Sequence, residues 1–188
     1  MESKFDVELR EISSAERGDL LMDILFKLEK QPNRYYRILQ EWWSSCDHMG
    51  HLVEDFKILF ENQGSVPYEK YTKDNKRFYD SLPEEFTIYR GCGADASDGL
   101  SWTTDKKIAY KFARGHRYIP VKRPRLLSAT IRKSWHDIVF VSNDRKESEV
   151  VLNCSKDYDA TVLELTKTDI EAELGEPNAP FVYLPTGT

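Results

Sequence analysis

The hydrophobic pattern of this chain changes its period once, close to residue 84, and this change constrains the fold more than any other feature. Before it, apolar residues recur at three- and four-residue intervals, which predicts helices with one apolar face. After it, short runs of β-branched and aromatic residues predict strands. Helices and strands that are segregated along a chain favour an α+β fold over alternating parallel βαβ units.

Four helices are expected in the first part of the chain, and they cover residues 15–30, 33–46, 48–62 and 67–81. Pro32 lies where the first helix would end, and the side chain of Asn33 can cap the second helix. The second helix carries four large aromatic residues, which form either core or a contact patch, with core the favoured interpretation: Tyr35, Tyr36, Trp42 and Trp43.

Six strands and one internal helix are expected after residue 84. The strands cover residues 86–89, 100–103, 126–131, 138–141, 150–152 and 161–165. The helix begins at Thr104 or Asp105 as its cap and ends at Gly115. The predicted organisation is a helical lobe at 1–83, a β-rich core at 84–175 and an extended tail at 176–188.

Composition limits the class of protein. The chain has 188 residues, of which 40% are hydrophobic and 12% aromatic, so it is long and apolar enough to bury a core and is not a disordered chain. No stretch approaches the roughly 20 apolar residues that span a bilayer. The first ten residues lack the layout of a secretory signal, and three scattered cysteines favour reduced thiols, so a cytoplasmic protein is expected.

Three short patterns in the β-rich core carry the chemistry. They are Tyr89-Arg90-Gly91, Ser101-Trp102-Thr103 and Glu147-Ser148-Glu149. Each pattern alone is weak evidence of a functional site, because a strand-end arginine is usually a surface charge and a Ser-x-Thr strand is usually ordinary sheet. Strand alternation predicts that Glu147 and Glu149 lie on the same face, although an exposed strand edge gives the same spacing.

The order of these patterns resembles the Arg-Ser-Glu class of mono-ADP-ribosyltransferases. That family has a strand-end arginine, a Ser-x-Ser or Ser-x-Thr strand followed by a helix that ends in a Phe-Ala pair, and a Glu-x-Glu that opens a late strand. Phe112-Ala113 is the matching pair here. The helical N-terminal segment is similar to that of small phage-encoded and bacterial members. The resemblance implies a core of two sheets with an NAD cleft between them, and no metal.

The resemblance also implies roles for the glutamates and for the serine strand. Glu149 would face the positive charge that develops on the ribose when the nicotinamide bond breaks. Glu147 would act as general base on the incoming nucleophile, which favours an arginine of a target protein as acceptor. Ser101 would hold Glu149 by a hydrogen bond, and Thr103 would support the strand.

The remaining implied residues would bind NAD. Arg90, with its neighbour Gly91, would contact the dinucleotide and hold a phosphate. Phe112 would stack on nicotinamide or, as an equally weighted alternative, belong to the core. Arg117 lies in a basic loop where the family binds the phosphates and nicotinamide.

A basic window surrounds that loop. Residues 106–133 contain ten Lys or Arg and no Asp or Glu. This charge could attract the pyrophosphate of NAD, a nucleic acid, or an acidic partner protein, or it could be a solvated loop. An alternative function is therefore a fold relative without transfer activity that binds a nucleic acid or a partner protein, and another is ADP-ribose transfer to water or to a nucleic acid.

Other candidate sites are weaker. Cys46, His48 and His51 provide only three metal ligands, so no metal site is expected. Cys92 is interpreted as a buried or unreactive thiol without a catalytic role. The loop at 134–146 is expected to meet the target, with Trp135 or Phe140 as either a contact or a core residue. Together these observations favour an NAD-dependent mono-ADP-ribosyltransferase that modifies a protein, such as a phage or bacterial effector in a host cytoplasm.

Overall fold

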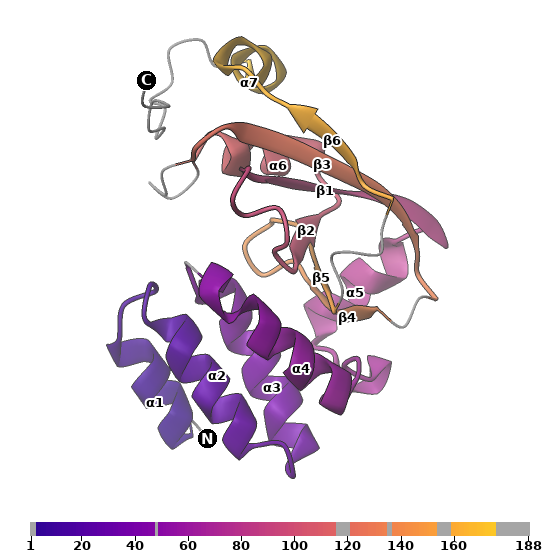
Figure 1. Cartoon of the computed structure of the whole chain (residues 1–188). Helices are drawn as coiled ribbons and strands as arrows, with labels where there is room; N and C mark the ends of the chain where they lie inside the picture. The colour runs from indigo at the N-terminus through magenta and orange to yellow at the C-terminus, as the bar shows by residue number, and fades with distance from the viewer. Residues whose placement is uncertain (1–2, 48, 116–120, 135–136, 154–158, 176–188) are drawn as a thin grey trace.

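A computed structural model describes residues 3–47, 49–115, 121–134, 137–153 and 159–175. These residues form seven α-helices and a six-stranded antiparallel sheet, which confirms the α+β class. Figure 1 shows the first helices packed together as a lobe beneath the sheet, so helices that are segregated along the chain are also segregated in space.

The helices of the lobe are α1 (Lys4–Glu11), α2 (Arg17–Lys27), α3 (Pro32–Trp42), α4 (Val53–Gln63) and α5 (Lys73–Ser81), with short 3-10 turns η1 (Trp43–Ser45), η2 (Met49–Leu52) and η3 (Tyr68–Lys70) between them. Helix α1 was not expected. It begins with a capping box in which Ser3 and Asp6 satisfy each other's backbone N–H groups. The expected cap at Asn33 is wrong, because Pro32 already occupies the first turn of α3, where a missing N–H costs nothing.

The strands are β1 (Glu85–Gly93), β2 (Ser101–Thr103), β3 (Pro124–Arg132), β4 (Ile138–Ser142), β5 (Glu149–Leu152) and β6 (Thr161–Glu164). They form one sheet in the order β4-β5-β2-β1-β3-β6, and each neighbouring pair is antiparallel. All six strands were predicted from the sequence, but β1 continues to Gly93, so the expectation that Arg90 and Gly91 lie at the end of a strand is wrong.

The expected pair of separate sheets is wrong for the described residues. Strand β2 pairs with β5 through three residue pairs and with β1 through Tyr89 and Thr103, so it joins the two halves into one ladder. Figure 1 shows that β1, β3 and β6 run across the molecule while β5 and β4 descend toward the helical lobe. A twisted sheet that is held together at one residue pair can turn sharply there without breaking.

Two helices cover the other face of the sheet. Helix α6 (Lys106–Ala113) is capped by Asp105, whose carboxylate accepts hydrogen bonds from the N–H groups of residues 107 and 108. Helix α7 (Lys167–Leu174) follows β6 and packs on α6. Helix α6 confirms the one helix expected among the strands, whereas α7, after the last strand, was not expected. The sequence carries a signal for α7, because Thr166 and Asp169 form a capping box.

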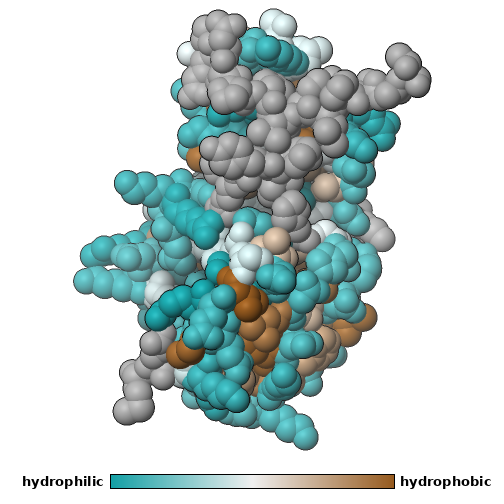
Figure 2. Space-filling model, turned by 90° about the vertical axis from the view of Figure 1, so that its left-hand side faces the viewer, coloured by the Kyte–Doolittle hydropathy of each residue, from teal (hydrophilic) through white to brown (hydrophobic). Residues whose placement is uncertain are grey.

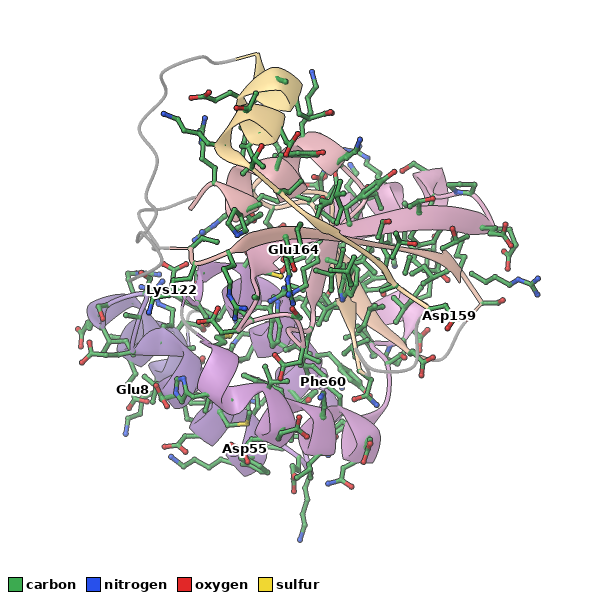
Figure 3. All side chains as sticks on the ribbon, turned by 45° about the horizontal axis from the view of Figure 1, so that its top comes forward. Glu8, Asp55, Phe60, Lys122, Asp159 and Glu164 are labelled. Atoms are coloured by element: carbon green, nitrogen blue, oxygen red, sulfur yellow. The ribbon has the colours of Figure 1, made fainter. Side chains whose placement is uncertain are left out.

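The helical lobe and the sheet share one hydrophobic core. The largest buried cluster runs from Leu9 in α1 to Leu152 in β5. Three of the aromatic residues of the second predicted helix, Tyr35, Tyr36 and Trp43, are buried in it, as the core interpretation predicted, and Trp42 packs against it. In Figure 3, Phe60 lies on the side of α4 closer to the sheet and Asp55 on the outer side. No helix among the described residues is long and apolar enough to cross a membrane.

Figure 2 shows another side of the molecule. Hydrophobic side chains gather in the lower half of this view, over the helical lobe, and hydrophilic side chains surround them. Four large hydrophobic side chains of the lobe are exposed: Val7, Phe26, Ile58 and Tyr68. Isolated apolar side chains of this kind are normal on a protein surface and are not assigned a role.

Candidate active site

A cavity of about 500 Å³ lies between the helical lobe and the sheet. Its volume is within the range that binds small molecules and cofactors. All the predicted site residues that the structure describes line it: Arg90, Gly91, Ser101, Thr103, Phe112, Glu147 and Glu149. Arg117, the eighth predicted residue, lies outside the described residues. The fold thus brings the three sequence patterns and the end of α6 to one place.

Glu149 is the first residue of β5 and is only 9% exposed. It lies opposite Thr103 of β2 on one side and Ser142 of β4 on the other. The indole N–H of Trp43 donates to Oε1 of Glu149 at 3.1 Å and to Oγ of Ser101 at 3.1 Å. The expected arrangement, in which Ser101 holds Glu149, is therefore replaced by one in which Trp43 contacts both.

Glu147 precedes β5 in the turn that joins β4 to β5. Two residues of this turn, Lys146 and Ser148, have positive φ angles of 56° and 49°. The left-handed backbone at Ser148 interrupts the strand alternation from which a shared face was predicted for the two glutamates. Both nevertheless line the cavity. Unfavourable backbone conformations of this kind are concentrated at functional sites, where the surrounding structure holds them.

Thr103, for which the resemblance implied support of the strand, contacts the turn that carries Glu147. Its hydroxyl donates to the carbonyl oxygen of Glu147 at 2.6 Å and accepts from the N–H of Asp105 at 3.0 Å. The N–H of Thr104 also donates to the carbonyl oxygen of Ser148. The end of β2 therefore fixes the backbone of Glu147 relative to the start of α6.

Arg90 lines the cavity, and its guanidinium group also donates hydrogen bonds to carbonyl oxygens of the protein. Its Nη1 donates to the carbonyl oxygen of Ser101 at 2.6 Å, and its Nη2 donates to that of Ala96 at 3.1 Å. A Cβ atom at Gly99 would overlap this guanidinium. Arg90 therefore also braces the loop between β1 and β2, and its role toward a phosphate stays a prediction.

Close packing requires a glycine at position 91, and the sequence did not reveal this requirement. A Cβ atom built on it would overlap the carbonyl oxygen of Ala109, because α6 packs directly on β1 at this point. Its predicted contact with the dinucleotide stays untested, although it lines the cavity. Phe112, from the same helix, is half-buried and faces the cavity rather than lying within the buried core.

The helical lobe supplies the wall opposite the motifs, and sequence reasoning missed it. Trp43, Cys46, Asp47, Met49 and Phe56 are among the lobe residues that line the cavity. No local pattern links Trp43 to Glu149, which follows it by 106 positions. The adjacent pair of tryptophans at the end of a predicted helix was the only signal available.

The thiols of Cys46 and Cys92 are buried, as expected. Burial raises the pKa of the Cys46 thiol to about 12 and also raises that of Cys92. Neither is therefore a thiolate near neutral pH. His48 and Cys154 lie outside the described residues, and within these residues no group of side chains could hold a metal ion.

The comparisons with known proteins add no relative. No family model, curated protein or solved structure matches this chain. The relation to mono-ADP-ribosyltransferases therefore stays a resemblance, and it depends on the residues quoted above and on their arrangement.

Three cations of the basic window form ion pairs with acidic residues of other elements. Lys106 pairs with Glu173 of α7, Arg125 pairs with Glu164 of β6, and Arg132 pairs with Glu85 of β1. Arg125 and Arg132 lie near opposite ends of β3, and acidic residues from other parts of the sequence neutralise their charges. Figure 3 shows Lys122 and Glu164 on different parts of this region.

Phe140 is a core residue, which is one of the two roles expected for it, and not a contact for a target protein. It is fully buried in β4 and its ring packs edge-on against Trp43. This outcome follows from the burial of the whole strand β4, in which no residue faces solvent. Trp135, the other aromatic residue proposed for that contact, lies outside the described residues.

Proposed function

We propose that this protein is an NAD-dependent mono-ADP-ribosyltransferase that modifies a protein side chain, with arginine as the favoured acceptor. The observation that carries the proposal is the convergence of the residues of three separate sequence patterns on one cavity, together with the burial of Glu149 in its wall. Strands β1, β2 and β5 are neighbours in the sheet, and this arrangement brings Arg90, Ser101 and Glu149 to the same cavity.

Transfer of ADP-ribose from NAD requires two carboxylates with different roles. In the proposed reaction the bond between ribose and nicotinamide breaks, the bond electrons leave with nicotinamide, and positive charge develops on the ribose. Glu149, in a buried position, would stabilise this charge. Glu147, in the turn beside it, would accept the proton that the acceptor nitrogen loses as it bonds to the ribose. The products are nicotinamide, a proton and the ADP-ribosylated protein.

The competing proposal, a binding protein without catalytic activity, is favoured less. It needs a continuous basic surface, because affinity for a polyanion depends on several cations that act together. Three cations of residues 106–133 instead form ion pairs with acidic residues of β1, β6 and α7.

The experiment is to incubate the pure protein with labelled NAD and a cell lysate and to identify labelled species by gel and mass spectrometry. Wild-type protein is expected to label a discrete protein, and Glu149→Gln is expected to lose this labelling. Glu147→Gln is expected to reduce transfer more than NAD hydrolysis. A matched control is Glu61→Gln, which changes an exposed glutamate of α4. Free ADP-ribose without labelled protein would indicate hydrolysis, and no turnover of NAD would refute the proposal.

A further inference from the structure

We propose that Trp43 is a positioning residue for Glu149, so that the helical lobe completes the active site instead of only covering it. The catalytic part of this inference rests on the proposed function. The contact itself is independent of it, because it is defined by two buried side chains from distant parts of the chain.

The contact is a hydrogen bond to a carboxylate in a sheltered place. The indole N–H of Trp43 donates to Oε1 of Glu149 at 3.1 Å. Trp43 is 2% exposed and Glu149 is 9% exposed. A donor of this kind stabilises the ionised form of a carboxylate, and it does so more strongly where solvent is excluded. The same N–H donates to Oγ of Ser101, so one indole orients both Glu149 and Ser101.

The indole itself is held rigidly. Its ring packs edge-on against Phe56 with centroids 4.9 Å apart, and against Phe140 with centroids 6.0 Å apart. Phe60 packs on it at 5.7 Å. These rings come from α4 and β4, so the indole is fixed by both the lobe and the sheet. A donor that cannot turn away fixes the position of the carboxylate that accepts from it.

A second chain of contacts connects the lobe to the turn that carries Glu147. The N–H of Asn143, at the start of this turn, donates to Oδ1 of Asn75 in α5 at 3.4 Å. The amide of Asn75 in turn donates to Oε1 of Gln40 in α3 at 3.3 Å. The lobe therefore contacts both ends of the segment from Asn143 to Glu149, and it is placed to set the geometry of both glutamates.

The first test compares two tryptophan variants in NAD turnover. Trp43→Phe keeps an aromatic ring in the core but removes the N–H donor. We expect kcat to fall about 10- to 100-fold, with KM changed less than about threefold, because the lost interaction acts on the carboxylate that meets transition-state charge. Without its donor, the ionised form of Glu149 should be less stable, which moves the acidic limb of the kcat profile to higher pH.

The matched control is Trp42→Phe. This adjacent indole also donates to a buried carboxylate, that of Asp6, but it does not line the cavity. Trp42→Phe should leave the acidic limb where it is in the wild type, even if it lowers stability. An unchanged kcat and an unchanged acidic limb in folded Trp43→Phe would overturn the inference.

The second test needs no activity. In protein labelled with ¹⁵N at tryptophan, the indole resonance of Trp43 is assigned by its loss in Trp43→Phe. We expect this resonance to shift with pH as Glu149 titrates, and the shift to disappear in Glu149→Gln. Eight other charged or titratable groups line the cavity and are unchanged in that variant: Cys46, Asp47, His51, Tyr89, Arg90, Cys92, Asp95 and Glu147. A titration that persists in Glu149→Gln, or no titration at all, would overturn the contact.

The two tests separate this inference from the proposed function. If wild-type protein does not turn over NAD while the Trp43 resonance follows Glu149, the proposed function fails and the positioning contact stands. If NAD is turned over but Trp43→Phe behaves as wild type, the proposed function stands and the role of Trp43 fails.

Discussion

At the scale of single residues, Gly91 shows how a motif position can serve packing. A methyl group at Gly91 would overlap the backbone of α6, which cannot move aside as a flexible side chain can. We expect Gly91→Ala to lower the free energy of unfolding by about 3 kcal/mol, at the upper end for overpacking. The measurement is denaturant unfolding. Gly50→Ala is the matched control, because nothing lies within 4 Å of its added carbon, and an equal loss in both variants would contradict this explanation.

Asp6 is a residue whose effect on stability depends on pH. Burial raises its pKa, but hydrogen bonds from Arg37, Ser3 and Trp42 outweigh burial and hold the pKa well below its usual value. A carboxylate with a lowered pKa in the folded state stabilises the fold above its unfolded pKa, near 4, and loses this effect progressively at lower pH.

We therefore expect Asp6→Asn to lower the free energy of unfolding by about 2 kcal/mol at pH 7, since it weakens hydrogen bonds to a charged group. The difference from wild type should narrow as pH falls below about 4. Urea unfolding at a series of pH values measures this. A difference that stays constant down to pH 2.5 would show that the charge of Asp6 is not responsible.

The sequence identified which residues meet but not what each one contacts. Seven of the eight predicted site residues line the cavity, because the strands that carry them and the helix after β2 were recognisable, although the end of β1 was not. The partner of Glu149 was assigned to Ser101, whereas the indole of Trp43 contacts both. A family pattern carries no information about a residue that lies outside it.

At the scale of elements, the turn between β4 and β5 is strained. Lys146 is exposed and has a φ of 56°, a conformation that costs a side-chain residue about 1 kcal/mol and costs glycine nothing. We expect Lys146→Gly to raise the free energy of unfolding by up to about 1 kcal/mol. Arg145→Gly, beside it and without a positive φ, should lower it by about 0.5–1 kcal/mol through chain entropy. Thermal unfolding of both variants checks the prediction, which fails if their signs agree.

Element boundaries were predicted best where apolar periodicity or β-branched runs were long. Helices α1 and α7 were missed, although each begins with a capping box, at Ser3 and at Thr166. Both are only eight residues long, too short for a periodic pattern to stand out. Their caps were the readable signal, and the sequence analysis gave more weight to periodicity.

At the scale of the whole molecule, the lobe and the sheet share one buried cluster from Leu9 to Leu152. A core that includes both parts should unfold as a unit, because neither part keeps its apolar surface covered without the other. We expect tryptophan fluorescence, which reports on Trp42 and Trp43 in the lobe and Trp102 in the sheet, to change together with far-UV circular dichroism during denaturant unfolding. Two separate transitions would show independent domains.

The joining of the two halves of the sheet could not be predicted from the sequence. It depends on a single residue pair, Tyr89 with Thr103, and strand patterns do not specify which strands become neighbours. The same limit applies to the cavity, whose two walls are far apart in the sequence and are brought together only by burial of the shared core.

The central claim is that Glu149 serves the cleavage of NAD in this cavity. The most direct measurement is the release of nicotinamide from NAD by the wild type, by Glu149→Gln and by the control Glu61→Gln, with folding of all three verified by circular dichroism. We predict release by the wild type and by the control, and a loss of at least about 10²-fold in Glu149→Gln. Equal release by all three proteins, or none by the wild type under any condition in which a target lysate is present, would contradict this account.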